Sequence, residues 1–227
     1  MFSSFFSGEK MKTWVSSDEL LQCPTIQSTP HSNMLIDCHL HTSRYSPCSR
    51  LDPFEACELA LKRGLDALVI TEHQIQLTPQ EVRELQGFFP ELALYSGLEV
   101  TLEEGVDVVV ITRNQGLEVD FGVPLQEVLS LLGPDRASSF LFLAHAFRWT
   151  RIRTPGMDQV LAEMDGMEMS SVNILAGQCR LVQDRFLPDA LEDYKQALED
   201  FNLLPVFNTD AHMGLAVGSI INEIPET

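Results

Sequence analysis

The stretch Asp37-Cys38-His39-Leu40-His41-Thr42 decides how this chain is interpreted, and it follows a short apolar run at 34–36. In an extended strand, alternate side chains point to the same side, so we expect Asp37, His39 and His41 to share one side. Two imidazoles held in this way at a strand end are a natural pair of metal ligands. Asp37 would be placed to orient one imidazole. Taken alone, a His-x-His pair is more often a chance feature of a surface, so the rest of the chain decides.

Apolar strands alternate with amphipathic helices from residue 34 onward. Asp52-Pro53-Phe54-Glu55 and Thr78-Pro79-Gln80-Glu81 each combine a capping residue, a proline and a glutamate, which predicts a helix start. Continuous apolar runs such as 67–71 and 140–144 are typical of strands buried on both faces. This alternation indicates an α/β fold with parallel strands and outer helices. About seven such units favour a (β/α) barrel over an open sheet.

Most of the histidines fall at the ends of the predicted strands. In a parallel barrel the carboxyl ends of the strands converge on one rim, which is where active sites form. We therefore expect one metal site there, and we expect His31, in the N-terminal segment, to be a solvated loop residue. The strand-end residues are His39, His41, His73, His145, Asp210 and His212.

Length and composition fit one domain after an extension. Residues 1–33 are rich in Ser, Thr, Gln and Pro and show no sustained period, so we expect a flexible extension before a domain over 34–227. Hydrophobic residues make up 44% of the 227, which is enough for a sizeable core. The five cysteines form no C-x-x-C pair, which favours reduced thiols in a cytoplasmic protein. No apolar run is long enough to predict a membrane span.

The charge of the chain bears on its partners. Its 15 basic and 33 acidic side chains give a formal net charge of −18. Such a field repels polyanions, so nucleic acid is a disfavoured partner and a small anionic substrate bound through metal ions is favoured. The sequence leaves the oligomeric state open.

Six short motifs that contain most of these candidate residues occur one after another along the chain. They are D-C-H-L-H-T, Y-S-x-C-S-x-L-D-P, G-L-D-A-L-V-I-T-E-H, G-L-E-V, L-A-H-A-F-R and N-T-D-A-H. The series, from Met34 to the end of the chain, resembles the PHP (polymerase and histidinol phosphatase) family. The resemblance implies a distorted seven-stranded (β/α) barrel, two or three divalent metal ions and phosphoesterase activity. Zinc, manganese and iron all suit a set of imidazole and carboxylate ligands.

The resemblance also implies a role for each candidate ligand. Glu99, in the G-L-E-V motif, matches the carboxylate that bridges two metals in the family. The other matches are His39, His41 and Asp210 for the first metal, His145 for the second, and His73 and His212 for a third position.

Several positions depart from the family pattern. Glu72 stands where an aspartate is usual, and we expect it to act outside the ligand set. Asp107 matches a position that is often histidine, so it is either a harder metal ligand or an exposed residue at a strand start. Where many members carry a ligand after the paired histidines, this chain offers Ser46 and Cys48, which leaves the third metal open. Glu168 resembles a family glutamate, and we expect a supporting role for it.

These residues predict a metal-dependent hydrolase. The leading hypothesis is a phosphoesterase that cleaves a small phosphate monoester with a metal-activated water. Arg148 and Arg44 lie in rim loops and are the candidate phosphate contacts, because a guanidinium binds phosphate oxygens bidentately. The alternatives are a nuclease-like phosphodiesterase, an amidohydrolase-like enzyme on the same centre, or a non-catalytic metal-binding domain. Metal ions are the only cofactors predicted.

Overall fold

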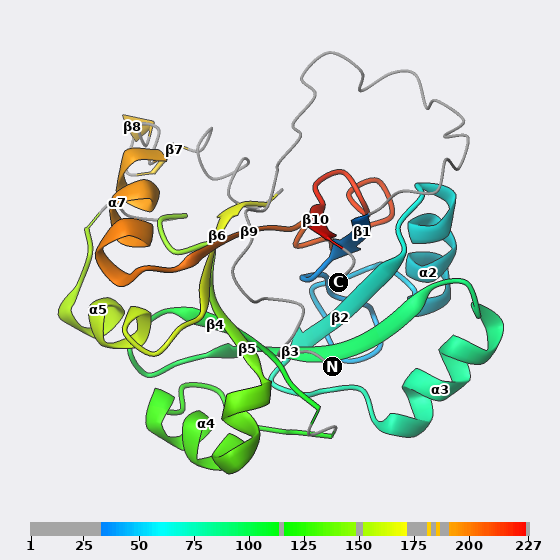
Figure 1. Cartoon of the computed structure of the whole chain (residues 1–227), viewed down its shortest axis with the longest axis horizontal. Coiled ribbons are helices and arrows are strands. Elements are labelled where there is room, and N and C mark those ends of the chain that lie inside the picture. Colours follow the sequence, from blue (N-terminus) through cyan, green and yellow to red (C-terminus); the bar gives the residue numbers. More distant parts are fainter. Residues whose placement is uncertain are drawn as a thin grey trace.

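The computed structural model describes residues 33–113, 116–148, 152–171, 181–182, 185–186 and 191–225. The expected extension lies outside these residues, apart from Asn33. An eight-stranded sheet in the order β10-β1-β2-β3-β4-β5-β6-β9 curls into a barrel shape (Figure 1). Its strands are β1 (Asn33–Asp37), β2 (Ala67–His73), β3 (Ala93–Thr101), β4 (Asp107–Ile111), β5 (Phe140–Ala144), β6 (Gly166–Ser170), β9 (Leu204–Phe207) and β10 (Asn222–Pro225). Two short strands, β7 (Leu181–Val182) and β8 (Arg185–Phe186), pair separately.

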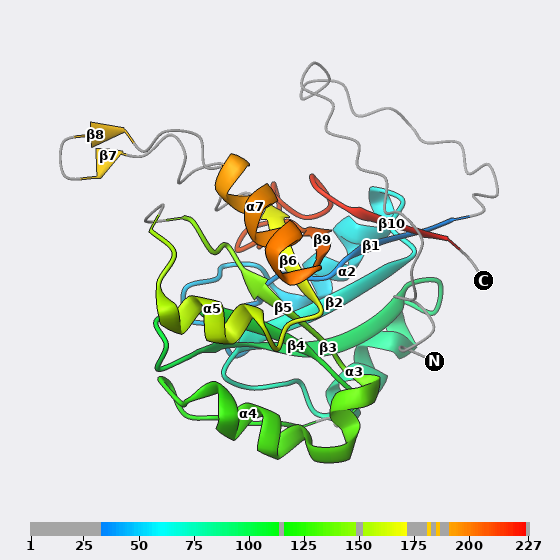
Figure 2. The ribbon, with the colours of Figure 1, turned by 60° about the vertical axis from the view of Figure 1, so that its left-hand side comes forward.

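Helices cover the outside of the barrel. Figures 1 and 2 show α2 and α3 beside β2 and β3, whereas α4, α5 and α7 cover the other half of the sheet. Their bounds are α2 (Pro53–Lys62), α3 (Pro79–Phe88), α4 (Leu125–Leu132), α5 (Pro155–Leu161) and α7 (Leu191–Phe201), with a 3₁₀ helix, η1, at Gly133–Ser138. Both predicted helix starts are confirmed: Asp52 caps α2, and Thr78 forms a capping box with Glu81 on α3. Within the described residues, no helix has the length and apolar character that a membrane span needs.

The expected α/β barrel class is confirmed, with a difference in strand direction. The pairs β1–β2, β2–β3, β5–β6 and β6–β9 are parallel, as expected. However, β4 is antiparallel to both β3 and β5, and β10 is antiparallel to β1. The reason at β4 is the short connection 102–106, because a parallel pair would need a crossover of roughly a dozen residues or more. The start of β4 therefore lies at the same rim as the ends of the parallel strands.

Side chains alternate between the barrel interior and the helices. The interior is a cluster of apolar side chains that includes Val69, Val109, Phe142 and Val206. Their neighbours in the chain, such as Leu68, Val108 and Leu141, pack outward in the two clusters beneath the helices. This period of two is what carries the polar residues at the strand ends into the mouth of the barrel.

The barrel closes at its rim through the segments that follow β1 and β9. The His41 N–H donates to the Ala211 carbonyl at 2.9 Å, and the Asp210 N–H donates to the His39 carbonyl at 2.8 Å. Leu40 and Ala211 form a parallel bridge at the same place. The two chain segments that carry the D-C-H-L-H-T and N-T-D-A-H motifs therefore lie side by side.

Candidate metal centre

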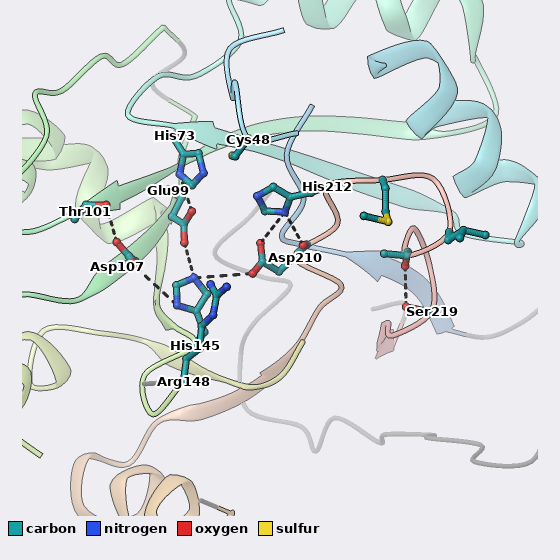
Figure 3. Close-up of a pocket in the computed structure, with 13 residues that line it drawn as sticks. Cys48, His73, Glu99, Thr101, Asp107, His145, Arg148, Asp210, His212 and Ser219 are labelled. Carbon is teal, nitrogen blue, oxygen red and sulfur yellow. Dashed lines mark hydrogen bonds and ion pairs between the residues drawn. The ribbon is translucent and has the colours of Figure 1, made fainter. Parts of the chain in front are cut away.

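Three overlapping groups of imidazole and carboxylate side chains lie at the mouth of the barrel. Within each group, candidate donor atoms lie within 4.8 Å of one another. The groups found among the described residues are His39, His41 and Asp210; Glu99, Asp107 and His145; and His41, His73 and His212. They adjoin a cavity of about 690 Å³ (Figure 3). The structure thus brings together every side chain that the sequence predicted as a metal ligand.

The first group has the spacing of ligands around one ion. His39 Nε2 lies 3.1 Å from His41 Nε2, and these nitrogens lie 3.6 and 3.3 Å from Asp210 Oδ1. Two ligands bound at ~2.1 Å with a tetrahedral angle lie ~3.4 Å apart. The residues present therefore fit a divalent ion held by His39, His41 and Asp210.

Glu168 orients the first imidazole. It is fully buried, and its Oε1 accepts a hydrogen bond from His39 Nδ1 at 3.0 Å, so that His39 Nε2 is presented to the centre. Its Oε2 accepts from the His145 backbone N–H at 3.1 Å. The Glu168 carboxylate therefore contacts His39 of the first group and the backbone of His145 of the second, which is the kind of supporting role expected for it.

Asp37 does not take the role that strand alternation predicted for it. Its carboxylate accepts from the Thr209 N–H at 3.1 Å and from the Thr209 hydroxyl, and it reaches His39 only at the backbone N–H, at 3.3 Å. The physical reason is that β1 ends at Asp37, so the alternation does not continue unchanged to His39. Asp37 instead ties the segment after β1 to the segment after β9.

Glu99 stands between the groups. Its Oε1 lies 2.9 Å from His145 Nε2 and 3.6 Å from His39 Nε2. Its Oε2 lies 2.9 Å from His73 Nδ1 and 3.3 Å from His41 Nε2. Because each oxygen faces a different pair of imidazoles, the carboxylate is placed to bridge two ions.

Asp107 reaches the centre because of the strand register. It pairs with Thr101 on β3 and with Ala144 on β5, which places it next to His145. Its Oδ2 lies 3.8 Å from His145 Nδ1, and its Oδ1 accepts from the Thr101 hydroxyl at 2.6 Å. The side chain is 31% exposed and faces the cavity. Its donor atoms lie within 4.8 Å of those of Glu99 and His145, so the three side chains could share an ion, and the ligand role of Asp107 stays a prediction.

Two of the candidate ligands have an uncommon backbone conformation. His145 has φ 28° and Asp210 has φ 50°. Such conformations cost on the order of 1–3 kcal/mol in residues other than glycine and tend to occur at functional sites. The hydrogen bonds from the His145 N–H to Glu168 and from the Asp210 N–H to the His39 carbonyl hold both residues in place.

The electrostatics of the centre favour added positive charge. Burial would raise the pKa of Glu99, but the imidazoles of His39 and His145 outweigh it and hold that pKa well below its usual value. The pKa of Asp210 is also lowered, because the imidazoles of His39 and His41 outweigh the effect of burial. Conversely, burial would lower the pKa of His145, but Glu99 and Asp210 raise it to about 9. The buried carboxylates therefore place negative charge at the centre, which divalent cations would offset, and this is a second sign that the residues fit metal ions.

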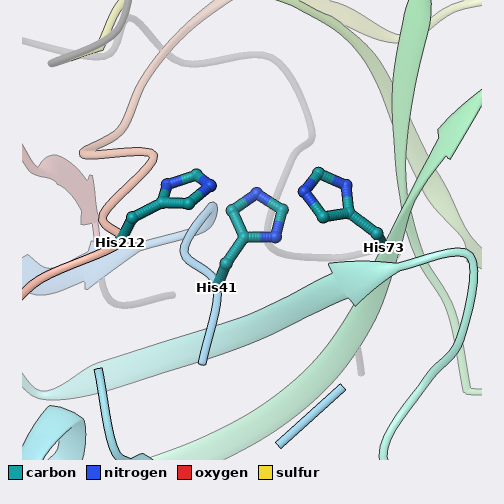
Figure 4. A group of neighbouring side chains, drawn as sticks. All are labelled: His41, His73 and His212. Carbon is teal, nitrogen blue, oxygen red and sulfur yellow. The ribbon is translucent and has the colours of Figure 1, made fainter. Parts of the chain in front are cut away.

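The third group consists of imidazoles alone. His41 lies between His73 and His212, with ring centroids 4.2 and 4.6 Å away (Figure 4). His212 Nδ1 donates to the Asp210 carbonyl at 3.0 Å, which leaves its Nε2 as a metal-binding atom. This group is the candidate site of a third ion.

Two of the positions that depart from the family pattern, Glu72 and the loop with Ser46 and Cys48, lie near this third group. Glu72 accepts hydrogen bonds from Thr42 and from the Ser46 hydroxyl, so it lies outside the ligand groups, as expected. The Ser46 oxygen also accepts from the His73 N–H at 3.1 Å. Cys48, a free thiol, lines the cavity, and burial raises its pKa. The loop therefore brings Cys48, rather than Ser46, to the cavity.

The two candidate phosphate contacts lie in different places. Arg148 lines the cavity beside His145 (Figure 3). Arg44 does not reach it: its Nε donates to Glu81, and it borders a small hollow between α2 and α3 that Phe54 also lines. Arg148 therefore lies at the cavity of the candidate metal centre and Arg44 lies away from it, and the role of Arg148 as a phosphate contact stays a prediction.

The sequence analysis missed one wall of the cavity. Met213, Leu215, Ala216 and Ser219, from the loop between β9 and β10, also line it. The available signal was the occurrence of large apolar residues in a loop directly after the N-T-D-A-H motif.

Comparisons with known proteins bear on the fold. No protein-family model and no curated protein matches the chain. Among solved structures, it is similar to a two-domain protein from Bacteroides vulgatus that contains a predicted PHP-like metal-dependent phosphoesterase, at TM-score 0.57 and 18% identity, covering 86% of this chain and 56% of that one.

Two further structures differ from it in activity. An amidohydrolase from Chromobacterium violaceum, with bound sulfate and no metal, matches at TM-score 0.56 and 14% identity, covering 81% of this chain and 89% of that one. A lesion-specific endonuclease from Pyrococcus furiosus matches at TM-score 0.56 and 15% identity, and the match covers 84% of this chain and 52% of the endonuclease. The resemblance found in the sequence is thus confirmed at the level of structure: the chain has the barrel fold of the PHP-like metal-dependent phosphoesterases.

Proposed function

We propose that this chain is a metal-dependent hydrolase that cleaves phosphate monoesters of small molecules. The observation that carries the proposal is the position of Glu99 between two sets of imidazoles, with Arg148 at the same cavity. Two divalent ions held side by side by a shared carboxylate can together bind a phosphate and activate a water. The fold likeness to PHP-like phosphoesterases supports the same chemistry.

The side chains divide the work as follows. His39, His41 and Asp210 would hold one ion, and His145 and Asp107 the second, with Glu99 shared between them. When bound, the ions would supply Lewis acidity that lowers the pKa of a water and offsets the charge of the phosphate.

Residues around the ligands complete the arrangement. Glu168 keeps His39 in the tautomer that binds through Nε2. Arg148 would bind the phosphate oxygens and orient the ester for attack. Its backbone N–H donates to the His145 carbonyl at 3.0 Å, so its position is tied to a ligand of the second group.

A small monoester fits the charge of the chain better than a nucleic acid does. With a formal net charge of −18, the chain would repel a polyanionic duplex. The likeness to an endonuclease keeps diester cleavage as the competing function, and the likeness to an amidohydrolase does the same for amide cleavage. Both are outcomes of the test below.

The test is an activity panel on protein stripped with a chelator and reloaded separately with zinc, manganese or iron. We expect phosphate release from monoesters only after reloading, and slower cleavage of diesters, lesion-containing DNA and amides. Faster cleavage of a diester or an amide would overturn the substrate class. Binding of ions without any turnover would support a non-catalytic domain instead.

Two arginine variants provide a matched comparison for the phosphate contact. Arg148→Ala should raise KM for a monoester roughly tenfold or more, because a charge-assisted contact to phosphate is lost. Arg44→Ala should leave KM unchanged, because Arg44 pairs with Glu81 away from the cavity. Equal effects of the two changes on KM would contradict the assignment of Arg148.

A further inference from the structure

The loop between β9 and β10 presents large apolar side chains to the cavity. Met213, Leu215 and Ala216 line it, next to the ligand His212. Met213 is 56% exposed and Leu215 is 84% exposed, so neither side chain contributes much to the core of the barrel. Exposed apolar surface at the mouth of a polar site is typical of a surface that binds part of a ligand.

Hydrogen bonds fix the backbone of this loop from several directions. The His212 carbonyl accepts from the Arg50 N–H at 2.9 Å and from the Ser49 hydroxyl at 3.2 Å. The Leu215 carbonyl accepts from the Arg63 guanidinium at 3.3 Å. The exposed side chain of Leu215 therefore extends from an anchored backbone.

Close packing against α2 fixes the middle of the same loop. A Cβ added at Gly214 would lie 2.7 Å from the Glu55 carboxylate and 2.8 Å from the Leu59 side chain. A larger residue at this position would have to displace the ends of both side chains, so the loop lies close against the helix. The backbone that carries the apolar residues is therefore anchored before any substrate arrives, which lowers the entropy cost of binding.

The loop that carries the apolar residues, from His212 to Ser219, lies across the centre from Arg148 (Figure 3). Figure 3 shows Asp107 and Arg148 on one side of the cavity, Ser219 on the other, and Asp210 and His212 between them. Among the described residues that line the cavity, Arg148 is the only arginine or lysine. A phosphate held near the ions and Arg148 would thus direct its organic group towards apolar side chains rather than towards a second positive charge.

We propose that Met213, Leu215 and Ala216 form the binding surface for the organic group of the substrate, and that the preferred substrates are phosphate monoesters of uncharged, apolar alcohols. This inference rests on the proposed function and narrows its substrate class. It argues against sugar phosphates and other strongly polar esters, whose hydroxyl groups would lose hydrogen bonds to water against this wall.

A series of ethyl, butyl and hexyl phosphate tests the proposal with constant chemistry. The three alcohol leaving groups have similar basicity, so differences in kcat/KM report binding of the alkyl chain. We expect kcat/KM to rise by roughly tenfold or more from ethyl to hexyl phosphate, because each buried methylene favours binding. We also expect propyl phosphate to be preferred over glycerol 3-phosphate, which has the same carbon chain with two hydroxyl groups.

The double variant Met213→Ser/Leu215→Ser should reduce the advantage of hexyl over ethyl phosphate at least fivefold. The matched control is Leu131→Ser, which changes an exposed leucine on α4 outside the cavity lining and should keep the full dependence on chain length. A flat series in the wild type, or a preference for glycerol 3-phosphate, would overturn the proposal.

Binding of ethyl- and hexylphosphonate to the metal-loaded protein separates the two proposals, because phosphonates cannot be hydrolysed at the C–P bond. Tighter binding of hexylphosphonate, lost in the double variant, supports the apolar wall even if no ester is turned over; in that case the proposed function alone fails. If ethyl phosphate is turned over but neither kcat/KM of the esters nor affinity for the phosphonates rises with chain length, the proposed function stands and only the apolar binding surface is refuted. Absence of phosphonate binding also overturns it.

Discussion

Asp107 begins β4, yet it lies at the metal centre because β4 runs antiparallel to its neighbours. Asp107→Ala should lower the bound metal by one ion per chain and remove most of the turnover, since the second ion would lose a ligand. Asp107→His should keep both ions and shift preference towards zinc, because imidazole is a softer ligand. Metal analysis and turnover of the variants check this. Asp120→Ala, at an exposed position, is the control, and unchanged metal content in Asp107→Ala would refute the ligand role.

Glu168 tests whether positioning of the ligands matters as much as their presence. Glu168→Gln keeps the shape but removes the negative charge that accepts from His39 Nδ1 and the His145 N–H. We expect metal affinity to fall roughly 10–100-fold while the barrel stays folded. Metal titration followed by thermal unfolding with and without ions measures both. Glu163→Gln, at an exposed position, is the control; a loss of stability with undiminished metal affinity would indicate a structural role only.

Much of the candidate centre could be predicted at the level of single residues. His39, His41, His145 and Asp210 follow apolar strands, and strand ends converge on one rim. The residue that orients the His39 imidazole could not be predicted correctly, because it depends on where β1 ends. Strand alternation pointed to Asp37, but the hydrogen bond to His39 Nδ1 comes from Glu168 on a strand far along the chain.

At the scale of elements, local signals were reliable and strand direction was not. The capping residues of α2 and α3 are confirmed at Asp52 and Thr78, since capping is decided by side chains a few residues apart. An apolar strand, by contrast, has the same pattern in either direction. The signal for a reversal at β4 was the turn 102–106, where Gly105 has φ 80°.

The start of α3 gives a prediction about pH. Burial would raise the pKa of Glu81, but hydrogen bonds from Thr78, Tyr45 and Arg44 lower it to about 2. A depressed pKa means that the ionised carboxylate stabilises the fold above pH ~4.5 and that this contribution is lost as pH falls towards 2. Glu81→Gln should therefore lower the free energy of unfolding at pH 7 by roughly 1–3 kcal/mol.

Denaturant unfolding at several pH values checks this prediction. The difference in unfolding free energy between wild type and Glu81→Gln should shrink as pH falls from 4.5 to 2. Glu84→Gln, an exposed position on the same helix, should show little difference at any of these pH values. If the difference in unfolding free energy between wild type and Glu81→Gln stays constant down to pH 2, the stabilising role of the ionised Glu81 carboxylate is contradicted.

At the scale of the whole molecule, the barrel assembles the centre from segments far apart in the chain. The segments after β1 and β9 meet through the hydrogen bonds of His41 with Ala211 and of Asp210 with His39. The number of strand–helix units predicted a barrel. How the segments after β1 and β9 meet to close it depends on tertiary packing, which no local sequence pattern encodes. The same holds for the apolar wall of the cavity, whose loop packs against α2 at Gly214.

The most direct test of the account is the metal content per chain of wild type, His39→Ala and Asp210→Ala, measured after reloading with zinc or manganese and removal of free ions. We expect at least two ions per chain in the wild type, and fewer ions without turnover in both variants, with circular dichroism showing that the barrel persists. Undiminished metal content and full activity in either variant, or a folded wild type that binds no ion, would contradict the account.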